Sequence, residues 1–412
     1  MSDIQRFKLD NGLRILVEPV SHVRSAAIGL WIATGSRHEA SGEYGVSHLI
    51  EHMLFKGTES RSAKEIAEAI EGRGGILNAF TDKEATCLYC RVLSDDVETG
   101  VDVLCDMILN SLLEPAELRR EKGVVLEEIH RSADEPADHV HDLHLEERWP
   151  LHPLGRPVIG TSKSVKALKR ENLVGYIQRR YTGPNLLAAV AGRVDPEAFR
   201  EMVAAKLGSI PGDSESTEAS RPEGKSTDRY HEKDIEQVHF CIGSDGCSVY
   251  DEDIHALAVM DAALGGGMSS RLFQEIREKR GLAYAVGSYA TSFGEGGTFT
   301  VYGGTNPKNW PLVQQLVRAE FDKVAKRGLA PEELGRTKRL LRGNMVLALE
   351  GMSGRMMRMS RNELYHGREI PLEETLAKIE RVSNDDVIRL ARNLLAPSKI
   401  GVTAIGPVPS EP

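Results

Sequence analysis

The sequence lacks the features that mark nucleic-acid-binding and membrane proteins. Its formal net charge is −9, whereas proteins that bind nucleic acids present a basic surface. It contains no run of about 18 consecutive apolar residues, which a transmembrane helix requires. The N-terminal segment has neither the basic start nor the apolar stretch of a signal peptide. We therefore expect no nucleic-acid or membrane partner, a fold that begins close to Met1, and a cytoplasmic location.

Cysteine is scarce and occurs an odd number of times. Only one C-x-x-C pair is present, and such a pair can bind zinc or serve redox chemistry. However, residues 86–92 have the pattern of a β-strand, on which residues three apart face opposite sides. We therefore interpret the five cysteines as free and mostly buried thiols: Cys87, Cys90, Cys105, Cys241 and Cys247.

Three other patterns indicate structure more than chemistry. Gly265–Gly267 resemble part of a phosphate loop, but no G-K-[ST] follows, so nucleotide binding is not expected. His139, His141 and His144 have a spacing that fits neither one helix face nor one strand face well, so we assign no metal site there. A methionine cluster at mixed helical spacing is expected to fill a core or an interface: Met352, Met356, Met357 and Met359.

The chain is long enough for two domains, and its composition places a boundary near the middle. A length of 412 residues exceeds one typical core. Residues 211–228 contain one apolar residue, Ala219, which is typical of a solvated linker. We therefore predict a first half at 1–210, a linker at 211–231 and a second half at 232–412.

The two halves have the pattern of a diverged repeat. Gly57–Arg61 resembles Gly267–Arg271 at an offset of 210 residues. In each half an apolar strand, at 26–33 and at 238–243, precedes two helices and then alternating strand residues. A hairpin is also predicted near the N-terminus, with its turn at Asp10–Gly12. These blocks predict an α+β fold of two homologous halves, each an antiparallel-rich sheet with helices on one face.

The sequence His48-Leu49-Ile50-Glu51-His52 is an H-x-x-E-H motif. On a helix, positions i, i+3 and i+4 share one face, so the two imidazoles can grip one metal ion while the carboxylate of Glu51 points into the same space. This is the reverse of the H-E-x-x-H motif of zinc proteases. The motif therefore indicates metal-assisted hydrolysis, although a partly exposed helix with two histidines is the alternative interpretation.

A catalytic zinc ion usually has three protein ligands and one water. The segment 116–131 has apolar residues at helical spacing and carries Glu121 and Glu128 two turns apart on one face. Glu128 could be the third ligand, and Glu121 could hydrogen-bond a ligand histidine from behind. A solvated glutamate-rich helix is the alternative interpretation of this segment.

With these residues in place, the chain resembles the pitrilysin or insulysin-type metalloproteases. It is most similar to their short two-domain branch, which includes mitochondrial processing peptidase and its bacterial relatives. That family has a glutamate ligand 76 residues after the second motif histidine, which is the spacing from His52 to Glu128, and another glutamate seven residues earlier, which matches Glu121. The stretches 45–48 and 55–58 also resemble the family. The resemblance implies one Zn²⁺ per chain, bound by His48, His52 and Glu128, with Glu51 as general base.

The resemblance also implies residues that contact the substrate. In the family, the strand that matches residues 76–81 is an edge strand near the metal, to which a peptide adds by main-chain hydrogen bonds; Asn78 and the Ala79 backbone would contact substrate. An arginine and a tyrosine seven apart in the second half match Arg277 and Tyr284. In the family these reach the substrate, so Tyr284 could donate to the oxyanion and Arg277 could hold a carbonyl group.

The second half lacks the imidazoles of the motif, because the offset of 210 carries His48 to Ala258 and His52 to Ala262. Only the N-terminal half can hold this metal. The family encloses substrate with four such halves, so a homodimer is expected, or a heterodimer with a homologue that lacks the motif. The expected function is a zinc endopeptidase that cleaves unfolded peptides inside a clam-shell chamber. The alternatives are a silent peptide-binding or structural subunit of a processing peptidase and a zinc hydrolase of a different bond.

Overall fold

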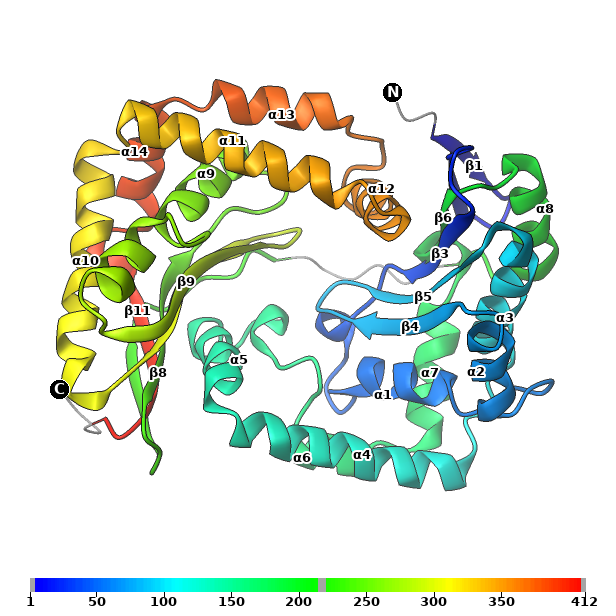
Figure 1. Ribbon diagram of the computed structural model, residues 1–412. Helices are drawn as coiled ribbons and strands as arrows, with labels where there is room; N and C mark the ends of the chain where they lie inside the picture. Colours follow the sequence, from blue (N-terminus) through cyan, green and yellow to red (C-terminus); the bar gives the residue numbers. More distant parts are fainter. Residues whose placement is uncertain (1–3, 214–219, 409–412) are drawn as a thin grey trace. The chain divides into compact units, whose positions relative to one another are not determined.

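The computed structural model describes residues 4–213 and 220–408, so residues 214–219 of the predicted linker lie outside the described residues. The described chain forms two compact units, which Figure 1 shows in colours that follow the sequence. The first unit combines the described residues of Met1–His130 and Pro157–Glu218 with Leu347–Pro371. The second combines Arg131–Arg156 with the described residues of Ala219–Val346 and Leu372–Pro412. Each unit therefore contains one segment from the other half of the sequence.

The first unit is built on a six-stranded sheet in the order β1-β2-β6-β3-β5-β4. The β2–β6 pair is parallel and the other neighbouring strands are antiparallel. The predicted N-terminal hairpin is confirmed, since β1 and β2 pair across the turn that contains Gly12. The strands are β1 (Gln5–Lys8), β2 (Arg14–Pro19), β3 (Ser25–Ile32), β4 (Ile76–Thr81), β5 (Thr86–Leu93) and β6 (Leu186–Gly192).

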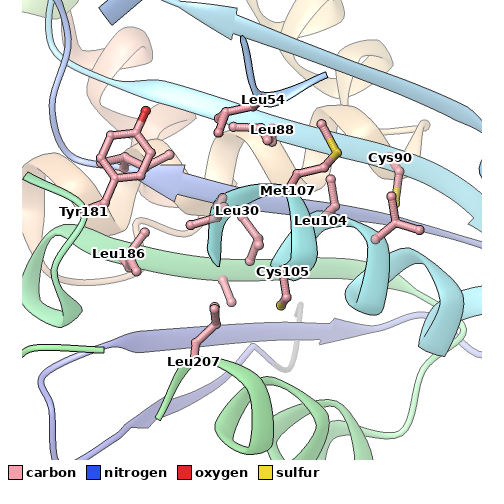
Figure 2. Close-up of a cluster of buried hydrophobic side chains, with 14 of the residues drawn as sticks. Leu30, Leu54, Leu88, Cys90, Leu104, Cys105, Met107, Tyr181, Leu186 and Leu207 are labelled. Carbon is pink, nitrogen blue, oxygen red and sulfur yellow. The ribbon is translucent and has the colours of Figure 1, made fainter. Parts of the chain in front are cut away.

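Most helices of this unit cover one face of the sheet. Alternate residues of β3, among them Ile28, Leu30 and Ile32, enter a core shared with these helices, part of which is shown in Figure 2. Burying such side chains is the main driving force of folding, at roughly 1.5–3 kcal/mol each. The helices are α1 (Val46–Leu54), α2 (Ala63–Glu71), α3 (Val97–Asn110), α4 (Pro115–Asp134, whose end passes into the second unit), α6 (Ser162–Ala167), α7 (Arg170–Arg180) and α8 (Pro196–Leu207).

The other face of the first sheet is covered by α12 (Met352–His366), a helix from the C-terminal half of the sequence. The prediction that the methionine cluster fills a core is confirmed, because Met352, Met356 and Met359 are buried against Ala27 and Trp31 of β3. The helix approaches closely at Gly29 of the same strand, where an added Cβ atom would lie 2.6 Å from the Met356 sulfur and the methionine side chain would have to shift.

The C-x-x-C pair lies on strand β5, as expected from its pattern. Cys87 belongs to the core under α12, whereas Cys90 belongs to the core on the opposite face. The two thiols thus face opposite sides of the sheet. All five cysteines are free and buried, so their interpretation as buried thiols is confirmed.

The second unit repeats this architecture with a five-stranded sheet in the order β7-β11-β8-β10-β9. The β7–β11 pair is parallel and the other neighbours are antiparallel. Strand β7 begins within the last residues of the predicted linker. The elements are β7 (Asp228–Glu232), β8 (Val238–Asp245), α9 (Ile254–Leu264), a π-helix (Phe273–Glu278), β9 (Ala283–Ser292), β10 (Gly297–Thr305), α10 (Trp310–Arg327), α11 (Pro331–Ala348, whose end passes into the first unit), α13 (Leu372–Arg381), α14 (Asn384–Leu394) and β11 (Gly401–Gly406).

A helix from the N-terminal half, α5 (Pro136–Arg148), packs on β8 and β11 of this second sheet. It carries the three histidines of the sequence cluster. His144 is buried with its Nδ1 atom 3.1 Å from the Thr403 hydroxyl, and His141 lies 2.8 Å from the Tyr289 hydroxyl. These histidines pack α5 against its sheet.

The predicted fold class is confirmed: the chain is α+β, with two related halves, each an antiparallel-rich sheet with helices. What the pattern did not show is the exchange of α5 and α12 between the halves. Among the described residues, no helix combines the length and the hydropathy that a membrane span requires.

Candidate metal centre

The centre is built on α1, the helix that carries the H-x-x-E-H motif. Its N-terminus follows Gly45, which has a left-handed conformation with a φ of 89°. The buried carboxylate of Glu39 accepts hydrogen bonds from the backbone N–H groups of Gly45 and Ser47, at 2.8 and 2.9 Å. A carboxylate there satisfies free N–H groups and is favoured by the helix dipole. The predicted helix is confirmed, with Leu49, Ile50 and Met53 buried beneath it.

The two motif histidines and Glu128 converge. Glu128 lies on α4, far along the sequence, with its Oε2 atom 3.9 Å from His48 Nε2 and 3.7 Å from His52 Nε2. One ligand atom from each of the three residues lies within 4.8 Å of the others, and no other group of three or more such residues occurs in the part of the chain that the structure describes. The side chains of His48 and His52 are each 18% exposed and that of Glu128 is 28% exposed, so the centre remains accessible.

These distances fit one zinc ion. Zinc binds histidine nitrogen at about 2.0–2.1 Å and carboxylate oxygen at about 2.0–2.2 Å, so two tetrahedral ligand atoms lie roughly 3.3–3.5 Å apart. The nitrogen-to-oxygen distances exceed that range by only a few tenths of an ångström. Two imidazoles and one carboxylate also match the donor set of catalytic zinc sites that keep a position open for water.

Behind the histidines lies a second carboxylate. Glu121 is almost fully buried, with an exposed fraction of 6%. Its Oε2 atom lies 3.1 Å from His52 Nδ1. Its other oxygen, Oε1, lies 2.9 Å from the Nζ atom of Lys56, two residues after the end of α1. Because a carboxylate oxygen accepts hydrogen bonds, this contact favours the His52 tautomer that carries a proton on Nδ1 and offers the lone pair of Nε2 to a metal ion.

His48 has a different environment. Its Nδ1 atom is buried without a hydrogen-bond partner among the described residues. Burial, with a smaller effect from His52, lowers the pKa of His48 to about 4. A neutral imidazole has the free lone pair that metal binding requires.

Glu51 lies beside the cluster and contacts strand β4. Its Oε2 atom accepts a hydrogen bond of 2.6 Å from the hydroxyl of Thr81, the last residue of β4. Burial raises the pKa of Glu51, the Thr81 hydrogen bond and His52 oppose that rise, and Glu128 adds to it. A carboxyl group with a raised pKa next to a metal site suits proton transfer near neutral pH.

Strand β4 is an edge strand, since it pairs with β5 and ends the sheet order. Asn78 is exposed, and its side-chain oxygen accepts a 2.8 Å hydrogen bond from the N–H group of Ala79. The N–H group of Ala79 therefore has the Asn78 side chain as its partner, and not a neighbouring strand. An unpaired edge of this kind is where extended peptides add to sheets.

Arg277 and Tyr284 belong to the second unit. Tyr284 is 79% exposed at the start of the edge strand β9, and the Arg277 guanidinium lies over its ring at 4.9 Å. In α9 of this unit, Ala258, Asp261 and Ala262 occupy the positions that correspond to the H-x-x-E-H motif, so the two imidazoles are missing there.

Sequence reasoning missed three residues that shape the centre: Glu39, Lys56 and Thr81. Thr81 and Lys56 contact residues of elements that are distant in the chain. The hydrogen bonds of Glu39 cross the loop that precedes α1. Lys56 lies four residues after His52, a spacing that continues the motif face and could have signalled its position.

Comparison with known proteins identifies the family. The family profile described as "Insulinase (Peptidase family M16)" matches residues 14–162, and the profile "Peptidase M16 inactive domain" matches residues 167–341. A protein of Streptomyces coelicolor named "uncharacterized zinc protease" is 41% identical over 414 residues, which cover 98% of this chain and 90% of the relative. The chain belongs to the M16 peptidase family. The family resemblance noted in the sequence is thereby confirmed.

Other M16 relatives have the same extent. The uncharacterized zinc protease YmxG of Bacillus subtilis is 39% identical, with 95% of each chain covered. The solved structure of a peptidase M16 inactive domain from Pseudomonas fluorescens has a TM-score of 0.92 at 21% identity and covers 100% of this chain and 99% of its own. A protease from Helicobacter pylori has the same TM-score at 20% identity, with 99% and 100% covered. These two structures support the fold, and family membership makes the chain a metallopeptidase.

Proposed function

We propose that this protein is a zinc endopeptidase whose ion is held by His48, His52 and Glu128, with Glu51 as the general base. The cofactor is zinc, as in the relatives named zinc proteases, and one ion per chain is proposed. The observation that carries the proposal is the convergence of three ligand atoms, supplied by α1 and α4, beside the carboxylate of Glu51.

When bound, the zinc ion would lower the pKa of a water molecule to roughly 7 and polarise the scissile carbonyl group. The chain's own residues then move the proton. Glu51 accepts it from the attacking water through the carboxylate oxygen that Thr81 does not occupy, and delivers it to the leaving amine. Glu121 keeps His52 in the tautomer whose Nε2 atom binds metal.

Loss of the Thr81 hydroxyl should slow catalysis without removing metal. A Thr81→Val variant keeps the shape of the side chain but leaves the Glu51 carboxylate free to rotate. We expect kcat for a fluorogenic peptide to fall by about tenfold, equivalent to one hydrogen bond of about 1–1.5 kcal/mol. Bound zinc, measured by atomic absorption, should not change. An unaltered kcat would show that Thr81 does not orient Glu51.

We propose that substrate adds to β4 as an extended strand, with the Ala79 backbone and Asn78 as its contacts. The exposed edge position and the outward N–H group of Ala79 support this. For the second unit, the family resemblance supports Tyr284 as the donor to the oxyanion of the tetrahedral intermediate and Arg277 as a ligand of a substrate carbonyl group. The 79% exposure of Tyr284 leaves its hydroxyl free to reach a substrate.

Two substitutions separate these roles by their kinetics. Ala79→Pro removes the N–H group at an edge position that proline tolerates, so KM should rise with a smaller effect on kcat.

Tyr284→Phe removes one oxyanion donor, so kcat should fall by about 10²–10³-fold with little change in KM. Steady-state kinetics on one peptide measures both, and an unchanged KM for the first variant or kcat for the second refutes the assigned role.

We propose a homodimer that encloses unfolded peptides in a clam-shell chamber, since this chain supplies two of the family's four halves; a heterodimer with a motif-lacking homologue is the second arrangement. Light scattering of the purified chain measures the assembly, and a monomeric enzyme with full activity would refute the dimer. Comparing the cleavage of a short peptide with that of a compact folded protein tests the chamber, because equal rates would exclude it.

The competing function is a silent peptide-binding or structural subunit. The presence of His48, Glu51, His52 and Glu128 together in one cluster favours the enzyme. A fluorogenic peptide assay with and without a zinc chelator distinguishes the enzyme from the silent subunit. Hydrolysis that disappears with chelator and returns with zinc supports the endopeptidase. Binding of the peptide without hydrolysis, in zinc-loaded protein, would establish the silent subunit, and hydrolysis of a different bond would point to another zinc hydrolase.

A further inference from the structure

Lys56 is fixed in place by the backbone around it. Its N–H group donates to the carbonyl oxygen of Met53 at 3.1 Å, in the turn that ends α1. The next residue, Gly57, has a φ of 121° and accepts a hydrogen bond from the N–H group of Leu112. The side chain is 32% exposed and ends 2.9 Å from Glu121 Oε1. Lys56 is thus directed at the second carboxylate of the centre from a rigid position.

Glu121 depends on a cation at this point. Its side chain is only 7% exposed, and a buried carboxylate is costly unless it is paired and hydrogen-bonded on both oxygens. Oε1 pairs with Lys56, and Oε2 faces Nδ1 of the ligand His52. Without the lysine, Glu121 would have one oxygen unpaired in a buried position, and its hold on the imidazole would weaken.

The two motif histidines differ in this support. His52 is oriented by the chain Lys56–Glu121–His52, whereas Nδ1 of His48 has no partner among the described residues. Supporting hydrogen bonds to ligand histidines typically contribute 10–100-fold to metal affinity. The effect of Lys56 on the metal should therefore pass through Glu121 and His52 alone.

We propose that Lys56 is a positioning residue of the metal centre, which holds Glu121 and through it fixes the orientation and tautomer of His52. The inference rests on the proposed function insofar as it assigns the zinc ion to His48, His52 and Glu128. It deepens that function because it gives this cation a role in holding the ligand His52 through Glu121.

The test measures zinc affinity of the full-length protein by competition with a chromogenic chelator. Lys56→Met keeps the length of the side chain without its charge and should weaken zinc binding by about 10–100-fold. Lys56→Arg should restore most of the affinity. The control is Lys64→Met, since Lys64 is 82% exposed in a surface pair with Glu68 and should leave affinity unchanged. Affinity of Lys56→Met equal to or higher than that of the wild type overturns the proposal.

A double-mutant cycle tests the route through Glu121. In a Glu121→Gln background, Lys56→Met should have no further effect on zinc affinity, and a full additional loss would refute the route. Circular dichroism of the zinc-free proteins checks folding. Should Lys56→Met not fold, Lys56→Gln takes its place, and wild-type affinity of that variant overturns the proposal equally.

The proposed function can fail separately. If the wild type binds one zinc ion with the expected dependence on Lys56 but cleaves no peptide, the endopeptidase proposal fails and the role of Lys56 stands. If peptides are cleaved and zinc affinity is insensitive to Lys56, only the inference about Lys56 fails.

Discussion

Replacing Glu51 with glutamine is expected to reduce kcat for peptide hydrolysis by about 10²–10⁴-fold, the range supplied by a general acid–base group. The amide has the same shape and can still accept the hydrogen bond from Thr81, but it cannot take a proton from water. Because Glu51 is not among the three grouped ligands, the variant should retain one zinc ion per chain. Steady-state kinetics and metal analysis of the same sample measure the two quantities.

A surface glutamate of the same unit provides the control. Glu68 is 59% exposed and pairs with Lys64 on the outside of α2, so Glu68→Gln should leave both kcat and zinc content at wild-type values. If Glu51→Gln cleaves peptides at the normal rate, its assignment as general base is wrong. If it loses zinc, Glu51 has a structural role in the metal site that the geometry does not indicate.

Replacing His48 with alanine should remove the metal itself. The loss of one of three protein ligands should weaken zinc binding by more than the roughly 10–100-fold of a lost supporting hydrogen bond. Zinc at about 1,000 times its Kd stabilises a folded protein by about 4 kcal/mol. The wild type should therefore show a rise in Tm on addition of zinc that His48→Ala does not show at the same concentration.

Thermal unfolding with and without zinc, together with metal analysis, measures this effect. His22 is exposed, and His22→Ala should keep the full zinc-dependent rise in Tm. The rise disappears from the wild type as well if a chelator is present in excess. Retention of stoichiometric zinc by His48→Ala would remove this histidine from the ligand set.

Local periodicity was sufficient to predict one half of the metal centre. His48, Glu51 and His52 lie within two turns of one helix, so helical geometry alone puts them on one face. Glu128 lies on α4, and no local rule connects it with α1. Its approach to the imidazoles is a tertiary event, which the spacing shared with a known family indicated and helix periodicity could not.

The contacts that Lys56 and Thr81 make in the metal centre could not be predicted from the sequence. Thr81 reads as one residue of an alternating strand, and its hydrogen bond to Glu51 depends on how β4 lies against α1. The same limit applies to the exchanged helix α12. Its methionines predicted a buried face, but hydrophobicity is not directional, so the pattern could not say which sheet that face would cover.

Strand periodicity, by contrast, was a reliable guide. The prediction that Cys87 and Cys90 face opposite sides of a strand required only the alternation of side chains on β5, and each thiol is buried in a different core. The register of β5 is set by antiparallel neighbours on both sides, β3 and β4, which leaves no alternative orientation for the pair.

The most direct test of the central claim is a crystal structure of the zinc-loaded protein with anomalous diffraction collected at the zinc absorption edge. We predict one anomalous peak per chain, bonded to Nε2 of His48, Nε2 of His52 and a carboxylate oxygen of Glu128. A peak bonded to other residues, or a zinc ion on the two histidines with Glu128 turned away from it, would contradict the account.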